Sequence, residues 1–384
     1  MSQIARDLNL MDSHIRIVNW RNLRHLDWVL VVLVGALAYM GLSNMYSASY
    51  GYEGAESTSH FARQALFLGV GSLLALALVC VDYRFLVALA PVWYGLALLA
   101  LLAVLTVGLT VKGGRSWFRL GAFSLQPSEY AKLATIFMLA WYLSRTGPRI
   151  QKFQYLILAF IVAAVPSALI AAQSDAGTAL TYVPVVFAMV FVAGCRKRHL
   201  AAIILVGAAL APVAWMHMQP YQRDRVKTFM DPTTAPDSEG YQIIQTKIAV
   251  GSGQMWGKGV GQGTQTHLRF LPEYRTDFIF SLLAEERGFV GGTILIALFA
   301  GFLIRGLMLS EECREPAGSL LTAGCVAILA FHVFVNVAIT IHLMPITGLP
   351  LPFLSYGGSF YLTTMMCVGT MLSVRVRKGM FTEK

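Results

Sequence analysis

The stretch PAGSLLTAGCVAILAFHVFVNVAITIHLMPITGLPLPFLSYGGSFYLTTMMCVGTMLSV, from Pro316 to Val374, runs for 59 residues without a charged side chain. A helix that spans a bilayer needs about 20 mainly apolar residues, so this stretch is too long for one span. Its second half contains residues that interrupt helices, namely Pro345, Pro350, Pro352 and the pair Gly357-Gly358. The stretch therefore predicts two membrane spans joined by a loop over 345–358.

Further uncharged runs lie upstream of this stretch, and each is long enough, or nearly so, to cross a bilayer. They cover 28–52, 64–81, 85–111, 153–174, 176–195, 199–222 and 288–304. A shorter run, 133–144, becomes a full span only if Glu129 and Lys132 lie at its outer mouth. Together the runs predict about ten transmembrane helices.

The composition supports the same fold class. Of the 384 residues, 56% are hydrophobic and only 13% are charged, and the mean hydropathy is +0.61. Soluble proteins have about 25% charged residues, and the apolar runs here are spread along the chain, which excludes a soluble enzyme with one anchor. Most of the net charge of +10 lies between apolar runs, so we expect no nucleic-acid partner. We predict an all-α polytopic membrane protein that forms a single domain over 1–384.

The distribution of basic residues predicts the orientation of the chain. With the N-terminus inside, 17 lysines and arginines fall in inner segments, whereas the short outer loops hold five: Arg63, Lys112, Arg115, Arg119 and Lys132. Because basic residues are retained on the cytoplasmic side, both termini should be cytoplasmic. This topology gives an N-terminal tail over 1–27, a C-terminal tail over 375–384, and a large extracytoplasmic loop over 217–287 between helices 7 and 8.

The cysteines indicate whether the chain forms disulfides or binds zinc, and the first apolar run indicates whether a signal segment is cleaved. The five cysteines lie in or at the inner ends of apolar runs, and none has a CxxC or Cys/His spacing. We therefore expect neither disulfides nor a zinc site, and we assign no metal ligands. No small-residue cleavage signal follows the first run, which should remain as an uncleaved anchor.

A glycine-rich segment, GSGQMWGKGVGQGTQ over 251–265, lies in the predicted outer loop. It does not fit a Walker loop, because Gly259 follows Lys258 and Ser252 stands where the first glycine belongs. A tight surface loop is the favoured interpretation. Its glycines could alternatively bring backbone N–H groups close to a lipid diphosphate, with Lys258 as the counter-charge.

Carboxylates gather near the outer ends of the predicted spans: Glu129, Asp175, Glu273, Asp277, Glu285 and Glu286. Charged groups at membrane depth are costly and usually functional, but most of these have a structural alternative. Glu129 could pair with Lys132, Asp175 could cap the next helix, and Glu285 and Glu286 could form a solvated face. Asp277 leads into the apolar Phe278-Ile279-Phe280, and its spacing fits a helix cap as well as a catalytic role.

Two polar residues, His332 and Asn336, share one face of a predicted span. Such a pair could relay protons. An interhelical hydrogen bond is the more common arrangement, and we favour it here.

The outer segments carry short motifs in a fixed order. These are KGGRSW (112–117), QPSE (126–129), QSDAGT (173–178), DP (231–232), GYQ (240–242), FLPE (270–273), TDFIF (276–280) and LPFLSYGG (351–358). Over nearly the whole chain this order resembles the SEDS family (shape, elongation, division and sporulation). The FLPE and TDFIF motifs and the short tails resemble the elongation type, RodA, more than the division type, FtsW. The chain departs from the family pattern at Gln254, Arg287 and Phe360.

The resemblance implies a peptidoglycan glycosyltransferase that polymerises lipid II on the outer face of the bacterial cytoplasmic membrane. Its substrates would be lipid II and an undecaprenyl-diphosphate-linked glycan. Its partners would be a class B penicillin-binding protein, which is a transpeptidase, and other membrane proteins of the elongation complex. Replacing an α-linked diphosphate by a β-1,4 bond inverts the anomeric carbon, so one general base suffices.

Site residues follow from the resemblance. Asp277 matches the essential aspartate of the family and is the candidate base. The leaving diphosphate requires positive charge, for which the outer-face residues Arg115, Lys132, Lys258 and Arg275 are candidates, and a divalent cation could share this role. Of these four, only Lys132 matches a motif position of the family. The remaining predicted substrate-binding residues lie in the same motifs: Trp117, Glu129, Asp175, Glu273, Ser355 and Tyr356.

Two other classes of function compete with this one. A lipid II flippase would need polar groups through the full depth of the membrane, whereas the ionisable residues here gather at the outer mouth. A non-enzymatic scaffold of the elongation machinery would have no need of Asp277.

Overall fold

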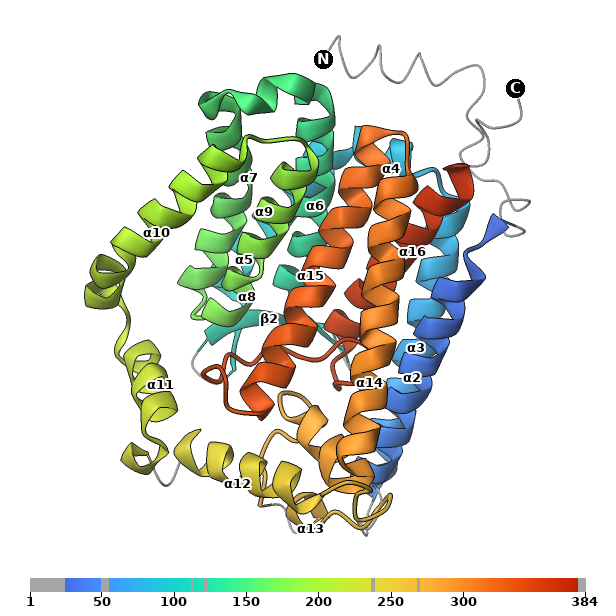
Figure 1. Cartoon of the computed structure of the whole chain (residues 1–384), viewed down its shortest axis with the longest axis vertical. Coiled ribbons are helices and arrows are strands. Elements are labelled where there is room, and N and C mark those ends of the chain that lie inside the picture. The colour runs from blue at the N-terminus through green and yellow to red at the C-terminus, as the bar shows by residue number, and fades with distance from the viewer. Residues whose placement is uncertain are drawn as a thin grey trace.

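The computed structural model describes residues 25–49, 55–111, 114–120, 123–235, 239–267 and 270–378 as a bundle of long helices (Figure 1). Most of the predicted N-terminal tail, 1–27, lies outside these residues, as do 379–384 of the predicted C-terminal tail. The helices of the bundle are α2 (Trp28–Ser49), α3 (Ala55–Cys80), α4 (Tyr83–Ala88), α5 (Ala90–Val107), α6 (Pro127–Thr146), α7 (Phe153–Ala172), α8 (Ala176–Leu180), α9 (Tyr182–Val192), α10 (Lys197–His217), α14 (Ile279–Glu312), α15 (Pro316–Thr340) and α16 (Gly358–Lys378).

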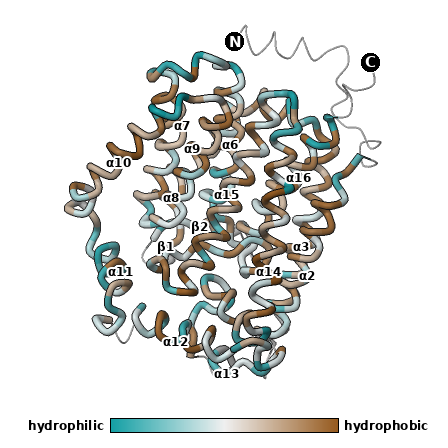
Figure 2. Tube along the Cα trace, in the orientation of Figure 1, coloured by the Kyte–Doolittle hydropathy of each residue, from teal (hydrophilic) through white to brown (hydrophobic). Residues whose placement is uncertain are grey.

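Six helices in the described part of the chain are long and apolar enough to span a membrane. They lie at Trp28–Ser49, His60–Cys80, Ala90–Val107, Phe153–Ala172, Ile279–Glu312 and Pro316–Thr340, and Ala176–Val192 forms a shorter apolar segment. The prediction of a helical polytopic membrane protein is therefore confirmed. Hydrophilic residues lie mainly at the ends of the bundle and along α11 (Figure 2).

The predicted run 85–111 is not one helix. It is divided at Leu89, where Pro91 occupies the first turn of a new helix, and it ends at Val107 because Gly108 has extended backbone angles. The last residues of the run form β1 (Leu109–Val111), which pairs antiparallel with β2 (Gly114–Leu120), and β2 pairs with β3 (Phe123–Leu125). This small sheet departs from the all-α prediction, because Leu109, Thr110 and Val111 continue the uncharged run without continuing its helix, and threonine and valine favour strands.

Two further spans are interrupted. The run 176–195 contains α8 and α9, which meet at Thr181, whose hydroxyl donates to the Thr178 carbonyl at 2.7 Å. Helix α14 is broken at Gly288, where φ is +63°. The predicted start of a span at 288 thus coincides with a kink, and helical residues extend upstream to Ile279.

The segment between α10 and α14 contains short helices: α11 (Pro220–Met230), η3 (Pro232–Thr234), α12 (Glu239–Ser252) and α13 (Thr264–His267). Helix α10 is exposed along most of its length and extends away from the bundle (Figure 1). Asp231 caps η3, and the hydroxyl and N–H of Thr233 lower the pKa of its carboxyl.

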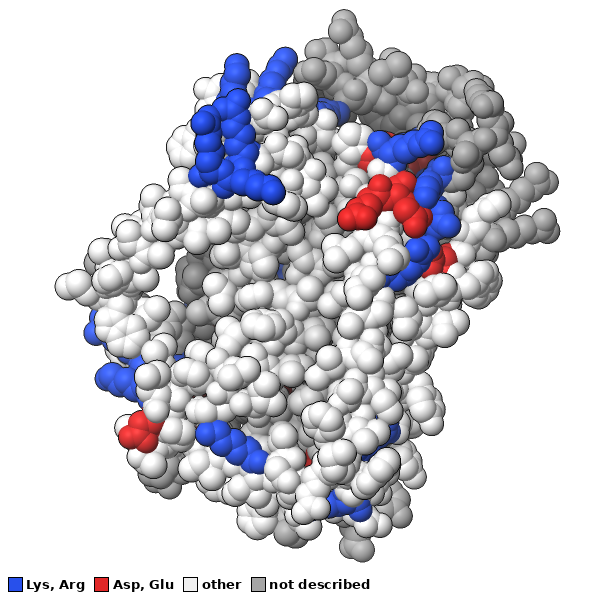
Figure 3. Space-filling model, viewed as in Figure 1, with Lys and Arg blue, Asp and Glu red and all other residues white. Residues whose placement is uncertain are grey.

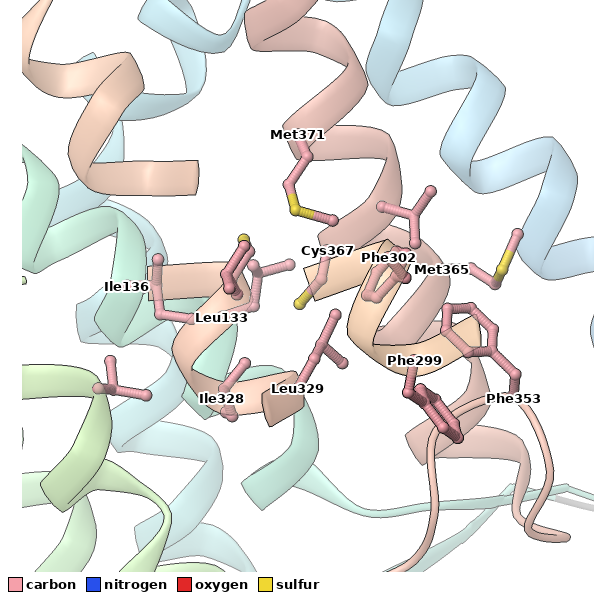
Figure 4. Packing of buried hydrophobic residues seen from close by; sticks show 14 of the residues in the cluster. Leu133, Ile136, Phe299, Phe302, Ile328, Leu329, Phe353, Met365, Cys367 and Met371 are labelled. Carbon is pink, nitrogen blue, oxygen red and sulfur yellow. The ribbon is translucent and has the colours of Figure 1, made fainter. Parts of the chain in front are cut away.

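The core surrounds α15, which packs against α6, α9, α14 and α16. Figure 4 shows side chains from four elements meeting there, including Leu133 and Ile136, Phe299 and Phe302, Ile328 and Leu329, and Met365 and Met371. Phe353 of the loop before α16 contacts Phe302, with ring centroids 5.6 Å apart. The core therefore anchors the loop at one end of the bundle.

Charged side chains concentrate at the opposite end from that loop (Figure 3). Asp27 accepts from Arg305 and lies 3.5 Å from Arg375, while Lys378 pairs with Glu312 at 2.8 Å. These contacts hold the start of α2 beside the ends of α14 and α16.

Candidate functional site

Asp277 lies in the turn just before α14 and is half-buried. Its N–H donates to the Glu273 carbonyl at 3.1 Å, and its own carbonyl accepts from Asn336 Nδ2 at 2.9 Å. The cap position of α14 is Phe278, so the helix-cap interpretation of Asp277 is wrong. Its Oδ2 lies 3.7 Å from where a Cβ on Gly348 would be, which places the carboxylate against the loop 345–358.

The turn that carries Asp277 is shaped by Glu273, whose φ is +56°. The Glu273 carbonyl accepts from the N–H groups of Thr276, Asp277 and Phe278 at 3.1–3.3 Å. Its carboxylate accepts from the Thr276 hydroxyl at 3.1 Å. Phe278 is 1% exposed, so the turn is fixed between its own hydrogen bonds and a core residue.

The other predicted residues of this turn contact α2 and the last loop. Arg275 donates to the Ala48 carbonyl at 3.4 Å, and its guanidinium lies 5.1 Å from the Tyr274 ring centre. The carbonyl of Arg275 accepts from the N–H of Tyr356 at 2.8 Å. Arg275 is therefore held at the C-terminal end of α2.

Ser355 and Tyr356 connect the last loop to the Asp277 turn. The buried hydroxyl of Ser355 donates to the Thr276 carbonyl at 2.6 Å and accepts from the Leu351 N–H at 2.8 Å. The ring of Tyr356 meets the His60 ring edge-on, with centroids 5.0 Å apart. Ser355 thus acts on backbone geometry, whereas Tyr356 presents a partly exposed ring.

Glu129 and Lys132 form the pair that their spacing predicts. Lys132 Nζ donates to Glu129 Oε1 at 2.8 Å, and the side chains are 1% and 3% exposed, respectively. The ammonium also lies 3.2 Å from His332 Nε2 and 5.5 Å from the centre of the Phe360 ring. The prediction of an interhelical contact for His332 is confirmed, and the departure at Phe360 lies against this cluster.

Asp175 caps α8, as its position predicts. Its Oδ1 accepts from the Thr178 N–H at 3.0 Å, and its Oδ2 accepts from Gln126 Nε2 at 3.3 Å. Gln126 is the residue before α6, so this contact joins the QSDAGT motif to the QPSE motif. In addition, Gly177 packs against the Thr347 carbonyl of the last loop.

The small sheet carries Arg115 and Trp117 on β2, where alternate residues share one face. Arg115 is exposed and Trp117 is half-buried. Gly114 packs against the Gln173 carbonyl, which brings the strand next to the Asp175 segment. Lys112 lies outside the described residues.

The glycine-rich segment folds onto the start of α14. Lys258 pairs with Glu285 at 2.7 Å and also donates to the Thr264 hydroxyl, while Glu285 accepts from the Gln265 N–H at 3.1 Å. Glu286 accepts from the Gly261 N–H at 3.0 Å and from the Ser47 hydroxyl.

Both carboxylates are buried, so the structural alternative of a solvated face at Glu285 and Glu286 is wrong. The physical reason is that the backbone of the glycine-rich segment turns its N–H groups toward these two carboxylates. This arrangement agrees with the tight-loop interpretation of 251–265.

The structure therefore brings most predicted residues into one region, where the Asp277 turn, the last loop, α15 and the first turn of α6 meet. His332 and Asn336 link these parts, although the sequence indicated them only as two polar residues on an apolar helix. Lys258 belongs to the separate contact between the glycine-rich segment and α14. A cavity of about 480 Å³ lies elsewhere, lined by Tyr221, Asp224, Lys227, Thr228, Thr234, Ala235 and Glu239.

Comparison with known proteins gives consistent matches over almost the whole chain. Residues 26–379 match a family model described as cell cycle protein, which covers FtsW, RodA and SpoVE. The chain is 37% identical to stage V sporulation protein E of Bacillus subtilis over 91% of its length and 96% of that protein. It is 34% identical to the peptidoglycan glycosyltransferase MrdB of Escherichia coli over 94% of its length and 96% of that protein.

Solved structures match in fold as well as in sequence. A chain of a peptidoglycan synthase complex, described for its coordination of polymerization and crosslinking, matches with a TM-score of 0.79 and 34% identity, over 92% of this chain and 98% of that one. The rod shape determining protein RodA of Thermus thermophilus matches with a TM-score of 0.68 and 33% identity, over 92% and 97% of the two chains.

Proposed function

This chain belongs to the family of cell cycle proteins that includes FtsW, RodA and SpoVE, and from that premise we propose how its site acts. The protein is a peptidoglycan glycosyltransferase that polymerises lipid II during cell-wall elongation. It is an integral membrane protein of the bacterial cytoplasmic membrane.

Asp277 is the proposed general base. The acceptor sugar's 4-hydroxyl loses its proton to this carboxylate as its oxygen attacks the anomeric carbon of the diphosphate-linked chain. The C–O bond to the diphosphate breaks in the same step, and the configuration inverts. The observation that carries this proposal is the position of Asp277, in a hydrogen-bonded turn at the outer end of α14, between α15 and the last loop.

The leaving diphosphate carries negative charge that basic side chains must stabilise. Arg115 is exposed on β2, and Arg275 lies two residues from Asp277, so these two are the proposed diphosphate contacts, with Trp117 beside Arg115. Lys132 and Lys258 are engaged by Glu129 and Glu285, and we assign them to shaping the site. A divalent cation could share the charge of the diphosphate.

The proposed topology has ten spans, with α4–α5 and α8–α9 each forming one, and with both termini in the cytoplasm. Residues 217–287 form the extracytoplasmic loop within a single membrane domain. Support comes from the basic residues, among them Arg305 and Lys378, at the end of the bundle where α14 and α16 end. Figure 3 shows basic side chains gathered at one end of the molecule.

The proposed partner is a class B penicillin-binding protein, which cross-links the glycan that this protein makes. The fold similarity to a chain of a peptidoglycan synthase complex supports it. Other membrane proteins of the elongation complex would assemble with the pair.

Lipid II supplied to the purified protein in detergent, with and without the penicillin-binding protein, tests the function directly. Glycan polymer made by the unmodified protein and absent with Asp277→Asn is the expected result. No polymer under any condition, combined with transfer of labelled lipid II across proteoliposomes, would favour the flippase. If the protein forms no polymer and transfers no lipid II, the non-enzymatic scaffold is the function that remains.

A further inference from the structure

Asn336 joins the backbone of Asp277 to the backbone of the last loop. Its Nδ2 donates to the Asp277 carbonyl at 2.9 Å and to the Leu349 carbonyl at 2.9 Å. The side chain is fully buried, and its Oδ1 has no hydrogen-bond partner among the described residues. Both N–H bonds of the amide are therefore used on two carbonyls that lie 72 positions apart in the chain.

His332 lies one helical turn before Asn336 and binds the next carbonyl of the same loop. Its Nδ1 is 3.1 Å from the Pro350 carbonyl, and its Nε2 is 3.2 Å from Lys132 Nζ. An ammonium can only donate, so Nε2 accepts and the proton of the neutral ring lies on Nδ1, where it reaches Pro350. The Glu129–Lys132 pair thus fixes the tautomer that binds the loop.

The loop at 348–350 depends on these two side chains. Gly348 has φ +74°, and Pro350 has no N–H with which to form backbone pairs. Buried carbonyls need donors, and α15 supplies one to each of two consecutive residues, Leu349 and Pro350. Gly348 in turn lies against the carboxylate of Asp277.

We propose that Asn336 and His332 are positioning residues that hold the Asp277 turn and the 348–350 segment in one fixed arrangement. The inference rests on the proposed role of Asp277 as general base. Asn336 positions Asp277 directly, through a hydrogen bond to the Asp277 carbonyl. His332 positions the 348–350 segment, which lies beside the Asp277 carboxylate. Neither residue is required to touch the substrate.

The consequence for catalysis is a loss of rate with little loss of binding. A displacement of about 1 Å at a reacting group can cost about 10²-fold in rate. The side chains of the proposed diphosphate contacts have anchors that do not involve Asn336: Arg115 lies on β2, and the Arg275 guanidinium donates to the Ala48 carbonyl at the end of α2. The effect of removing Asn336 should therefore appear in kcat and not in KM.

The first test compares Asn336→Leu with a matched control, Thr322→Val. Thr322 is also fully buried on α15, but among the residues that the structure describes its hydroxyl donates only to the Gly318 carbonyl of the same helix. We expect Asn336→Leu to lower kcat for lipid II polymerisation by about 10- to 100-fold, with KM within about twofold of normal. Thr322→Val should change neither. An unchanged kcat for a folded Asn336→Leu, or equal effects of the two variants, would overturn the proposal.

The second test separates the two contacts of His332 and remains informative where Asn336→Leu does not fold. The amide of His332→Asn stands close to the position of Nδ1 and can still donate to Pro350, whereas His332→Leu cannot. We expect His332→Asn to retain at least about tenfold more activity than His332→Leu at similar melting temperatures. Equal activities would contradict the role assigned to the Pro350 contact.

The proposed function is tested separately, because the unmodified protein must form polymer in the same assay. Absence of polymer from the unmodified protein would reject the enzyme assignment itself. Normal polymer from both that protein and Asn336→Leu would reject only the positioning role.

Discussion

Lys132 and Glu129 form an ion pair of 2.8 Å, one turn apart on α6, with almost no exposure of either side chain. Removal of one partner leaves the other charge buried, which typically costs about 3–5 kcal/mol. The pair is also coupled to the last loop, because Lys132 contacts His332. We therefore propose that the pair fixes the site geometry at the first turn of α6.

Exchange of the two charges tests this role. We expect Glu129→Gln and Lys132→Met each to lower stability and polymerisation strongly, because each leaves an uncompensated buried charge. The double variant Glu129→Lys with Lys132→Glu should restore part of both, measured by melting temperature and glycan yield. A double variant no better than either single one would show that mutual neutralisation is not what the site needs.

Asp277→Asn should abolish polymerisation while the protein stays folded. Loss of a general base typically costs about 10²–10⁴-fold in rate. Two hydrogen bonds that position this residue involve its backbone N–H and carbonyl, which the substitution retains. The measurement is glycan synthesis from lipid II, with co-purification of the penicillin-binding protein as the folding control. Robust synthesis by this variant would remove Asp277 from the mechanism.

Substitution of Glu285 should loosen the glycine-rich segment. Glu285 is fully buried and binds Lys258, Thr264 and the Gln265 N–H, and hydrogen bonds to charged groups contribute about 1.5–3 kcal/mol. We expect Glu285→Ala to lower the melting temperature and to expose 251–265 to limited proteolysis.

The contribution of Lys258 to the Glu285 contact is tested against an exposed ion pair, Lys227 and Asp224, as the matched control. Lys258→Met should raise proteolysis to a lesser degree, whereas Lys227→Met, which breaks the exposed pair with Asp224 at 3.7 Å, should have almost no effect. If Lys258→Met instead raised KM for lipid II without any change in proteolysis, its role would be substrate binding.

Much of this arrangement follows from local sequence patterns. Long apolar runs predict the spans, and short-range spacing predicts the Asp175 cap and the Glu129–Lys132 pair, because these contacts join residues three positions apart. The strand β1 could not be predicted, since Leu109–Val111 continue the apolar run of α5.

Local sequence patterns also could not predict the contacts between residues that are far apart in the chain. Glu286 binds Ser47 from 239 positions away, and Asn336 binds Asp277 from 59 positions away. Only the packing of α14 against α2 and α15 creates these contacts. For the same reason the spacing of Asp277 could not separate a cap from a catalytic group.

Gly177 should not tolerate a methyl group. A Cβ at this position would lie 2.2 Å from the Thr347 carbonyl, so either α8 or the last loop must shift. We expect Gly177→Ala to reduce polymerisation at least about tenfold. Gly207→Ala on α10 is the control, because a Cβ there meets nothing within 4 Å and alanine favours helix. Equal activities of the two variants would contradict close packing of the last loop on α8.

The topology should be visible to a membrane-impermeant thiol reagent in intact spheroplasts. Met230, in the proposed outer loop, is 77% exposed, and Gln151, in the turn Gly147–Gln151 (η2) after α6, is also exposed. The excess of basic residues in the proposed inner segments, 17 against five, predicts that Met230→Cys is labelled at once and Gln151→Cys only after lysis. The unmodified protein serves as the control, since four of its five cysteines are buried and the fifth, Cys313, is half-buried at the proposed inner end. Because the headgroup of lipid II is polymerised outside the membrane, the reverse labelling pattern would leave Asp277 on the wrong side and would overturn the proposed mechanism.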